Sequence, residues 1–290
     1  TSLRTLLLPP RTTARTTNAA AENINRIQRN HIMKIAVITG ASSGIGKQFA
    51  LTLKNNFDVD EIWLIARNRP RLEQTAENCG LAARIFSMDL SDTGAYTQYA
   101  EALEQTKPDV AVLINCSGFG KFEAFTDTSL GDNLNMIDLN CKAVVAMTQL
   151  TLPYMNKNAR IINVASVAAY QPIPYINIYG ATKSFVLSFS RALNRELKKR
   201  GISVTAVCPF WTKTAFFDRA VNRNDDAVVK KYAVLYDADK VVARAYNDAL
   251  KRKEISIYGA KARFQCFLTK ILPHSLVMNV WISQQKLKNR

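Results

Sequence analysis

The sequence predicts an α/β fold, a doubly wound parallel sheet with helices on both faces. Short runs rich in β-branched and apolar residues alternate with segments of helical spacing. Two of the runs, 35–38 and 110–114, contain only apolar residues, as strands do when helices cover both faces of their sheet. The expected strands span residues 34–38, 61–66, 83–88, 110–115, 160–165 and 203–208.

The composition is that of a soluble globular chain. Of its 290 residues, 48% are hydrophobic and 21% are charged, and Gly and Pro number 11 and 9. These values exclude a disordered chain and a collagen. The sequence also has no apolar run of about 18 residues, the length that crosses a bilayer.

The few cysteines and histidines limit the kinds of metal site and catalytic triad that the chain could form. The five cysteines form no Cys-x-x-Cys pair, which suits a reducing, cytoplasmic location. His31 and His274 are the only histidines, so we expect no metal site, and a histidine-based triad would need a residue near one end of the chain.

The two ends of the chain differ from its middle. Residues 1–32 hold five Arg and one acid, and regular apolar patterning begins only after Met33. We expect a flexible tail over 1–32, either a targeting segment or residues added before a native start at Met33. We expect a catalytic domain over 33–260 and a basic helical extension over 261–290.

The net charge of +16 is uneven. Residues 240–290 contain 11 Lys or Arg against Asp248 and Glu254. A solvated face on C-terminal helices explains this surplus most simply, and a membrane surface or an anionic ligand would also account for it. We expect no nucleic-acid partner, because no binding module accompanies the charge.

A glycine-rich turn joins the first expected strand to a helix over 45–54. It reads Thr39-Gly40-Ala41-Ser42-Ser43-Gly44-Ile45-Gly46. Glycines at this place allow a pyrophosphate to approach the backbone, and the helix N-terminus offsets its charge. A plain strand-to-helix turn is the alternative.

The end of the second strand indicates which dinucleotide would bind. It reads Ala66-Arg67-Asn68, without the carboxylate that holds the ribose hydroxyls of NAD. Arg67 can contact a 2′-phosphate, which favours NADP(H), although an arginine here also suits a helix cap or a solvated surface.

Two Tyr-x-x-x-Lys patterns occur in the chain. Both place a tyrosine and a lysine on one helix face. Only Tyr179, paired with Lys183, follows a strand that carries a serine, Ser166, 13 residues earlier. We interpret Tyr236 and Lys240 as a surface pair near a loop.

Together these features resemble the short-chain dehydrogenase/reductase family over roughly residues 34–215. Thr39, Gly40, Gly44 and Gly46 match its cofactor turn, and Asp89 matches the acid that faces adenine. Residues 115–118 correspond to its Asn-Asn-Ala-Gly segment, with Cys116-Ser117 in place of Asn-Ala. The resemblance implies a Rossmann-type fold and a catalytic set of Asn140, Ser166, Tyr179 and Lys183. It also implies that Tyr179 is the general acid, that Ser166 assists it, that Lys183 stabilises the phenolate and holds the ribose, and that Asn140 carries a relay water.

The resemblance further implies a cofactor-binding set and an assembly. The expected contacts are Gly40, Ser42, Ser43, Gly44, Ile45, Gly46, Arg67, Asp89, Leu90, Asn115, Gly118, Tyr179, Lys183, Pro209, Thr212 and Thr214. Family members often assemble as dimers or tetramers through the helices that carry Asn140 and Tyr179, so we expect a homo-oligomer.

The chain departs from the family after the sixth strand. The usual Pro-Gly-x-Val-x-Thr is here Pro209-Phe210-Trp211-Thr212-Lys213-Thr214. Thr212 can keep the backbone contact to the carboxamide, and the two aromatics are candidates for the substrate wall. A lid is expected over 210–236. Its aromatics, with aromatic and apolar residues before the active-site helix, favour an apolar steroid-like or fatty-acyl substrate, although many of the aromatics would also suit a core. These residues are Phe216, Phe217, Tyr232, Tyr236, Tyr170, Pro172, Ile173 and Tyr175.

The last segment mixes apolar and basic residues and is broken at Pro273. It predicts two short amphipathic helices that pack over the pocket, form an oligomer contact or lie on an anionic membrane surface as a peripheral contact. The whole sequence predicts an NADP(H)-dependent oxidoreductase of a ketone or secondary alcohol. A dinucleotide-binding sensor without turnover is the alternative.

Overall fold

The computed structural model describes residues 32–216, 220, 228–229 and 234–287. The chain divides into two units, Thr1–Ile32 and Met33–Arg290. The expectations for residues 1–31, and those for Phe217 and Tyr232 in the proposed lid, lie outside the described residues.

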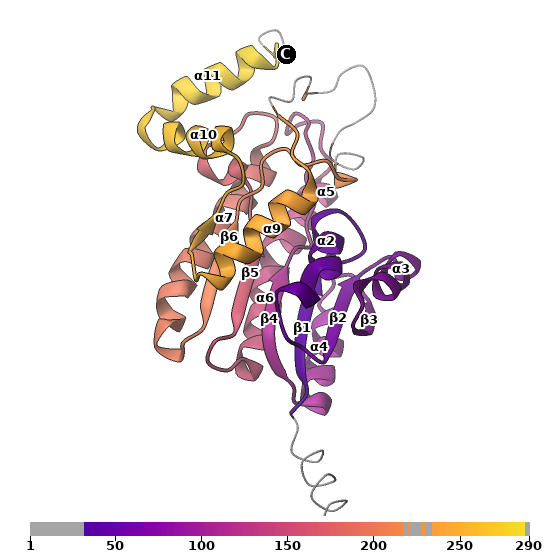
Figure 1. The fold of residues 1–290 in the computed structure, drawn as a ribbon. Helices are drawn as coiled ribbons and strands as arrows, with labels where there is room; N and C mark the ends of the chain where they lie inside the picture. The colour runs from indigo at the N-terminus through magenta and orange to yellow at the C-terminus, as the bar shows by residue number, and fades with distance from the viewer. Residues whose placement is uncertain (1–31, 217–219, 221–227, 230–233, 288–290) are drawn as a thin grey trace, which may run out of the picture. The chain divides into compact units, whose positions relative to one another are not determined.

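Seven parallel strands form one sheet in the order β3-β2-β1-β4-β5-β6-β7 (Figure 1). The order reverses between β1 and β4, which is the switch point where open α/β sheets bind their ligands. The predicted doubly wound fold is therefore confirmed. The strands are β1 (Lys34–Thr39), β2 (Glu61–Ala66), β3 (Ala82–Ser87), β4 (Asp109–Asn115), β5 (Arg160–Val164), β6 (Ser203–Val207) and β7 (Ile255–Ser256).

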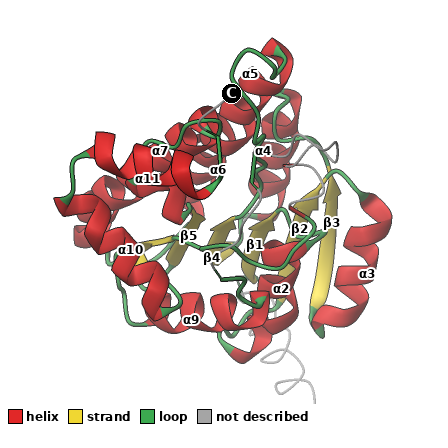
Figure 2. Ribbon diagram, turned by 90° about the horizontal axis from the view of Figure 1, so that it is seen from above, coloured by secondary structure: helices red, strands yellow, loops and turns green. Residues whose placement is uncertain are grey.

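Helices cover both faces of this sheet because successive strand residues point to opposite sides (Figure 2). On β1, Ile35 and Val37 pack in the cluster that includes residues of α4 (Gly94–Thr106), α6 (Ala143–Thr151) and α7 (Asn177–Glu196). Ala36 and Ile38 pack in the cluster that includes α2 (Gly44–Thr52), α3 (Arg69–Cys79) and α9 (Ala238–Leu250). The apolar runs of the sequence reflect this double burial.

The boundaries differ from the sequence expectations at a few places. The helix after the glycine turn ends at Thr52 and tightens into a 3-10 turn, Leu53–Asn55. Other 3-10 turns are Leu152–Tyr154, Val167–Tyr170 and Leu197–Arg200. The edge strand β7 was not predicted, because two residues carry no periodicity. Among the described strands it pairs with β6 alone, through Ala206 and Val207.

Helix α5 (Leu130–Ile137) continues into a π-helical turn, Asp138–Lys142, before α6. The two expected C-terminal helices are α10 (Ala260–Ile271) and α11 (His274–Gln284), and Pro273 separates them. Among the described residues, no helix combines the length and the apolarity needed to cross a membrane.

Candidate functional site

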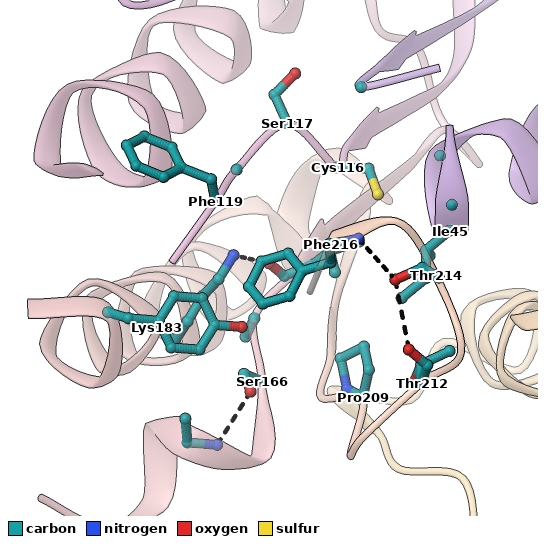
Figure 3. A pocket seen from close by; sticks show the side chains of 18 of the residues that line it. Ile45, Cys116, Ser117, Phe119, Ser166, Lys183, Pro209, Thr212, Thr214 and Phe216 are labelled. Carbon is teal, nitrogen blue, oxygen red and sulfur yellow. Dashed lines mark hydrogen bonds between the residues drawn. The ribbon is translucent and has the colours of Figure 1, made fainter. Parts of the chain in front are cut away.

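A cavity of about 520 Å³ lies at the carboxyl ends of the strands. Residues that follow β1, β2, β4, β5 and β6 line it, so it occupies the switch point of the sheet (Figure 3). Of the predicted site residues, the cavity brings together all except Asn115 and Asn140. Those lining it are Gly40, Ser42, Ser43, Gly44, Ile45, Gly46, Arg67, Asp89, Leu90, Gly118, Ser166, Tyr179, Lys183, Pro209, Thr212 and Thr214.

The glycine turn has no room for a side chain at Gly40 or at Gly46. A Cβ on Gly46 would lie 2.2 Å from the Gly40 carbonyl oxygen, and a Cβ on Gly40 would lie 2.9 Å from the backbone of Cys116. Thr39 fixes this approach, because its Oγ1 accepts hydrogen bonds from the Cys116 and Ser117 amides at 2.9 and 3.0 Å. The turn therefore presents bare backbone to the cavity at its glycines.

The N-terminus of α2 is suited to an anion. Its N-cap residue Ser43 makes no side-chain capping bond, and the first turn contains no acidic residue. The backbone N–H groups of the first turn, which have no partner within the helix, and the positive end of the helix dipole are thus available to a phosphate group. This geometry and the glycine turn fit the pyrophosphate of a dinucleotide.

Arg67 and Asp89 form an ion pair at the rim of the cavity. Arg67 Nη1 lies 3.3 Å from Asp89 Oδ2, and both side chains are exposed. Burial opposes ionisation of Asp89, but hydrogen bonds from Ser91 and the Arg67 charge prevail and lower its pKa. Asn68 and Arg71 line the same end of the cavity, so two guanidinium groups lie near the end of β2.

Ser166, Tyr179 and Lys183 come together on the opposite wall. Ser166 follows β5, and Tyr179 and Lys183 lie one turn apart on α7. Ser166 Oγ accepts from the Ala168 amide at 3.1 Å and also hydrogen-bonds with Tyr179. Lys183 Nζ donates to the Val164 carbonyl at 2.9 Å and lies 5.7 Å from the centroid of the Tyr179 ring.

Burial determines the ionisation states of Tyr179 and Lys183. It raises the pKa of Tyr179 to about 12, with the Ser166 hydrogen bond acting in the opposite direction. It lowers the pKa of Lys183 to about 8, while nearby thiols oppose that shift. Near neutral pH, Tyr179 is therefore an un-ionised acid and Lys183 is mostly a cation.

Asn140 and Asn115 lie behind the cavity. Asn140, in the π-helical turn, accepts from the Phe119 amide at 3.0 Å and donates to the Phe119 carbonyl and to Thr182 Oγ1. Asn115 Nδ2 donates to Thr148 Oγ1 and Asn163 Oδ1. These contacts position the loop after β4 against α7, and the relay and cofactor roles of the two asparagines stay predictions.

Aromatic residues form the remaining wall. Phe122 lies 5.9 Å from Tyr179, 6.1 Å from Trp211 and 6.1 Å from Phe216, measured between ring centroids. Ile173 and Phe210 also line the cavity, as the sequence suggested. Phe122 was missed, because no local pattern marks a residue that reaches a site from a distant element. Gln265, Trp281, Gln284 and Gln285 of the C-terminal segment also line the cavity, in agreement with the expectation that the C-terminal helices pack over the pocket.

The second Tyr-x-x-x-Lys pattern does not belong to the cavity lining. The Tyr236 amide donates to the Trp211 carbonyl at 2.8 Å, and its ring contacts Phe210 and Tyr258. Lys240 pairs with Asp237 at the surface. Tyr236 thus holds the loop after β6 in place.

Comparison with known proteins identifies the family. The family model described as short chain dehydrogenase matches residues 34–225. The chain belongs to the short-chain dehydrogenase family. It is therefore an oxidoreductase whose fold binds a nicotinamide cofactor and whose family acts on small molecules.

Two curated relatives of this short-chain dehydrogenase are named for their activities. Very-long-chain 3-oxoacyl-CoA reductase-B of Danio rerio is 32% identical over 203 residues, covering 66% of this chain and 64% of the relative. 17-beta-hydroxysteroid dehydrogenase type 3 of Mus musculus is 31% identical over 207 residues, covering 68% and 67%. An uncharacterized oxidoreductase of Staphylococcus epidermidis is 33% identical over 178 residues, covering 61% and 76%.

Solved structures share the fold. A short-chain dehydrogenase from Sphingobium yanoikuyae in complex with NADPH superimposes with a TM-score of 0.68 at 26% identity, covering 84% of this chain and 98% of that one. A Burkholderia phymatum short chain dehydrogenase/reductase in complex with NAD has the same fold, with a TM-score of 0.69 at 23% identity and coverage of 82% and 92%.

Proposed function

We propose that this short-chain dehydrogenase is an NADP(H)-dependent oxidoreductase of an apolar ketone or secondary alcohol. The observation that carries the proposal is the assembly of Ser166, Tyr179 and Lys183 beside an aromatic wall, opposite a bare glycine turn. The glycine turn and the N-terminus of α2 would hold the pyrophosphate of the cofactor.

NADP(H) is the cofactor we favour because of the charges at the end of β2. No carboxylate follows β2, and the nearby Asp89, which follows β3, is already paired with Arg67. Arg67 and Arg71 would instead meet a 2′-phosphate, which a planar guanidinium recognises through two parallel hydrogen bonds. Asp89 would then remain near the adenine end of the site.

Proton transfer belongs to Tyr179. When bound, the cofactor would supply a hydride to the carbonyl carbon. Tyr179 would donate its phenolic proton to the carbonyl oxygen, so that an alcohol forms and a phenolate remains. Ser166 would hydrogen-bond the same oxygen, and the Lys183 cation would stabilise the phenolate.

The substrate class follows from the cavity wall. Phe122, Phe216, Trp211 and Trp281 present apolar surface beside Tyr179. Such a wall favours a bulky apolar carbonyl compound over a sugar, because a sugar would leave hydroxyl groups without hydrogen-bond partners. The relatives named for 3-oxoacyl-CoA and hydroxysteroid substrates agree with this class.

The test is a titration followed by turnover. NADPH should bind more tightly than NADH, and a bulky apolar ketone should be reduced faster than small polar ketones. Tyr179→Phe should lower kcat by a factor of about a hundred or more, the usual contribution of general acid catalysis, with cofactor affinity retained.

Tyr236→Phe is the matched control, because this tyrosine begins the other Tyr-x-x-x-Lys pattern and does not line the cavity. It should keep normal kcat. Tighter binding of NADH would refute the role of Arg67. Turnover that survives in Tyr179→Phe would refute the role of Tyr179. Tight NADPH binding without turnover of any ketone would instead favour a sensor.

We also propose that the enzyme is a homo-oligomer. Leu130, Leu134 and Ile137 are exposed along one side of α5, and Phe185 is exposed on α7. A second copy that covers these helices would remove this apolar surface from water.

A further inference from the structure

The outer surface of the C-terminal helices is unusually apolar. Six large apolar side chains between positions 264 and 280 are 36% to 62% exposed. They lie on α10, on α11 and in the link between them, at the top of the view in Figure 1. We call this surface the C-terminal apolar face; its members are Phe264, Phe267, Ile271, Leu272, Leu276 and Val280.

Helix α10 turns its large apolar side chains outward. Phe264, Phe267 and Ile271 follow the i, i+3, i+7 spacing of one helix face. The opposite face packs on the protein through the small residues Ala262, Cys266 and Thr269, which are buried. This arrangement is the reverse of a helix that merely covers a core, which would bury its phenylalanines.

Cations border this face. At about 100° per residue, Lys261 lies on one side of the α10 stripe, and Arg263 and Lys270 lie on the other. All three side chains are exposed. Residues 260–287 contain no Asp or Glu. By contrast, the exposed leucines of α5 have acidic residues close by in the sequence, Asp132 within the helix and Asp138 directly after it.

We propose that the C-terminal apolar face docks on the surface of an anionic phospholipid bilayer, with α10 and α11 lying along the interface. Apolar side chains would enter the boundary between headgroups and acyl chains, and the bordering cations would meet lipid phosphates. A second copy of this chain is a poorer occupant, because it would bring basic helices against a chain of net charge +16.

The same helices reach the substrate cavity from their other side. Gln265 of α10 and Trp281 of α11 line the cavity, next in sequence to Phe264 and Val280 of the exposed face. Docking would therefore place the cavity wall within one helix thickness of lipid. The docking proposal stands on exposure and charge alone, independently of the proposed substrate.

The test is co-sedimentation of the full chain with vesicles, without cofactor or substrate. The protein should pellet with vesicles of phosphatidylcholine and phosphatidylserine, pellet less with phosphatidylcholine alone, and dissociate as salt rises. Phe267→Ser should weaken binding to anionic vesicles about tenfold, because burial of a phenylalanine ring contributes on that order.

Phe125→Ser is the matched control. Phe125 and Phe267 are 58% and 57% exposed, and Phe125 lies outside the C-terminal helices. The control should bind as the unaltered chain does, and both variants should keep the same Tm. Equal binding by Phe267→Ser, or no binding at low salt, would overturn the proposal. So would a dimer, seen by sedimentation without vesicles, that Phe267→Ser dissociates.

Discussion

Lys183 is the residue whose ionisation should control the pH profile. Burial lowers its pKa to about 8, and it raises the pKa of the neighbouring Cys116 to about 12 and of Cys141 to about 11. Between pH 7 and 10, Lys183 thus loses its charge while both thiols and Tyr179 stay neutral. Since a neutral amine cannot stabilise a phenolate, kcat/KM for carbonyl reduction should fall about tenfold per pH unit above that value.

Lys183→Arg separates this explanation from others. A guanidinium keeps its proton over the whole range, so the variant should have a lower rate but no fall between pH 7 and 10. The measurement is kcat/KM against pH at saturating NADPH. An unchanged midpoint in the variant would assign the fall to another group.

Gly46 is a residue whose replacement should damage the site through the backbone. A Cβ at this position would lie 2.2 Å from the Gly40 carbonyl oxygen, so α2 and the turn would have to separate. Gly46→Ala should cost about 3 kcal/mol of unfolding free energy, at the upper end of typical overpacking, and should weaken cofactor binding. Denaturant unfolding and an NADPH titration measure these effects.

Gly131→Ala serves as the comparison for Gly46→Ala. The nearest atom to its added Cβ is 3.9 Å away, and alanine favours the α5 helix in which it lies. This variant should be as stable as the parent or slightly more so. Equal losses in the two variants would show that the clash at Gly46 is relieved without cost.

At the scale of elements, α11 should influence which substrates bind. Trp281 is buried, its Nε1 donates to the Pro174 carbonyl at 3.1 Å, and its side chain lines the cavity. Trp281→Ala should raise the KM of a bulky apolar ketone about tenfold, because one wall of the cavity is lost, and leave that of a small ketone nearly unchanged. Steady-state kinetics on a homologous ketone series tests this.

Val280→Ala is the companion variant for Trp281→Ala. Val280 precedes Trp281 but is exposed and does not line the cavity. It should leave both KM values unchanged in solution. A KM that rises equally for bulky and small ketones in Trp281→Ala would mean that α11 supports the fold without selecting the substrate.

The elements predictable from sequence were those with a local signature. The wholly apolar runs gave β1 and β4, and the glycine turn marked the start of α2. Phe122 was out of reach, because only tertiary packing brings it to Tyr179. The approach of the C-terminal helices to the pocket was one of three expected alternatives, and nothing in the sequence singled out Trp281 as the residue that lines it. The pairing of Arg67 with Asp89 was also not predictable, because the two residues are 22 positions apart in the sequence and no periodic pattern links residues at that separation.

At the scale of the whole molecule, a buried carboxylate joins α9 to the sheet edge. Asp248 accepts from Arg244 Nε at 2.5 Å and from Ser256 Oγ of β7 at 2.9 Å, and Lys253 Nζ lies 2.9 Å from its other oxygen. Sequence patterning showed neither β7 nor this cluster. The contacts of Asp248 therefore hold the edge strand β7 in place, in addition to the few backbone hydrogen bonds between β6 and β7.

The charge of Asp248 should make the free energy of unfolding depend on pH. Burial opposes the charge of Asp248, but the hydrogen bonds from Arg244, Lys253 and Ser256 prevail and lower its pKa below the ordinary 3.8. A carboxyl whose pKa is lower in the folded than in the unfolded state stabilises the fold at pH values above the unfolded-state pKa. This contribution disappears as pH falls through the folded-state pKa.

Asp248→Asn should therefore lower Tm at pH 7 by about 8 °C, equivalent to about 3 kcal/mol for breaking a buried pair. The difference from the parent should shrink as pH falls below about 4, where the carboxyl of the unfolded parent chain takes up a proton while the folded one is still charged. Thermal unfolding across pH measures both, with Glu77→Gln on the exposed side of α3 as the control that should follow the parent throughout. A Tm difference that stays constant down to pH 2 would show that shape, and not charge, makes Asp248 important at this edge.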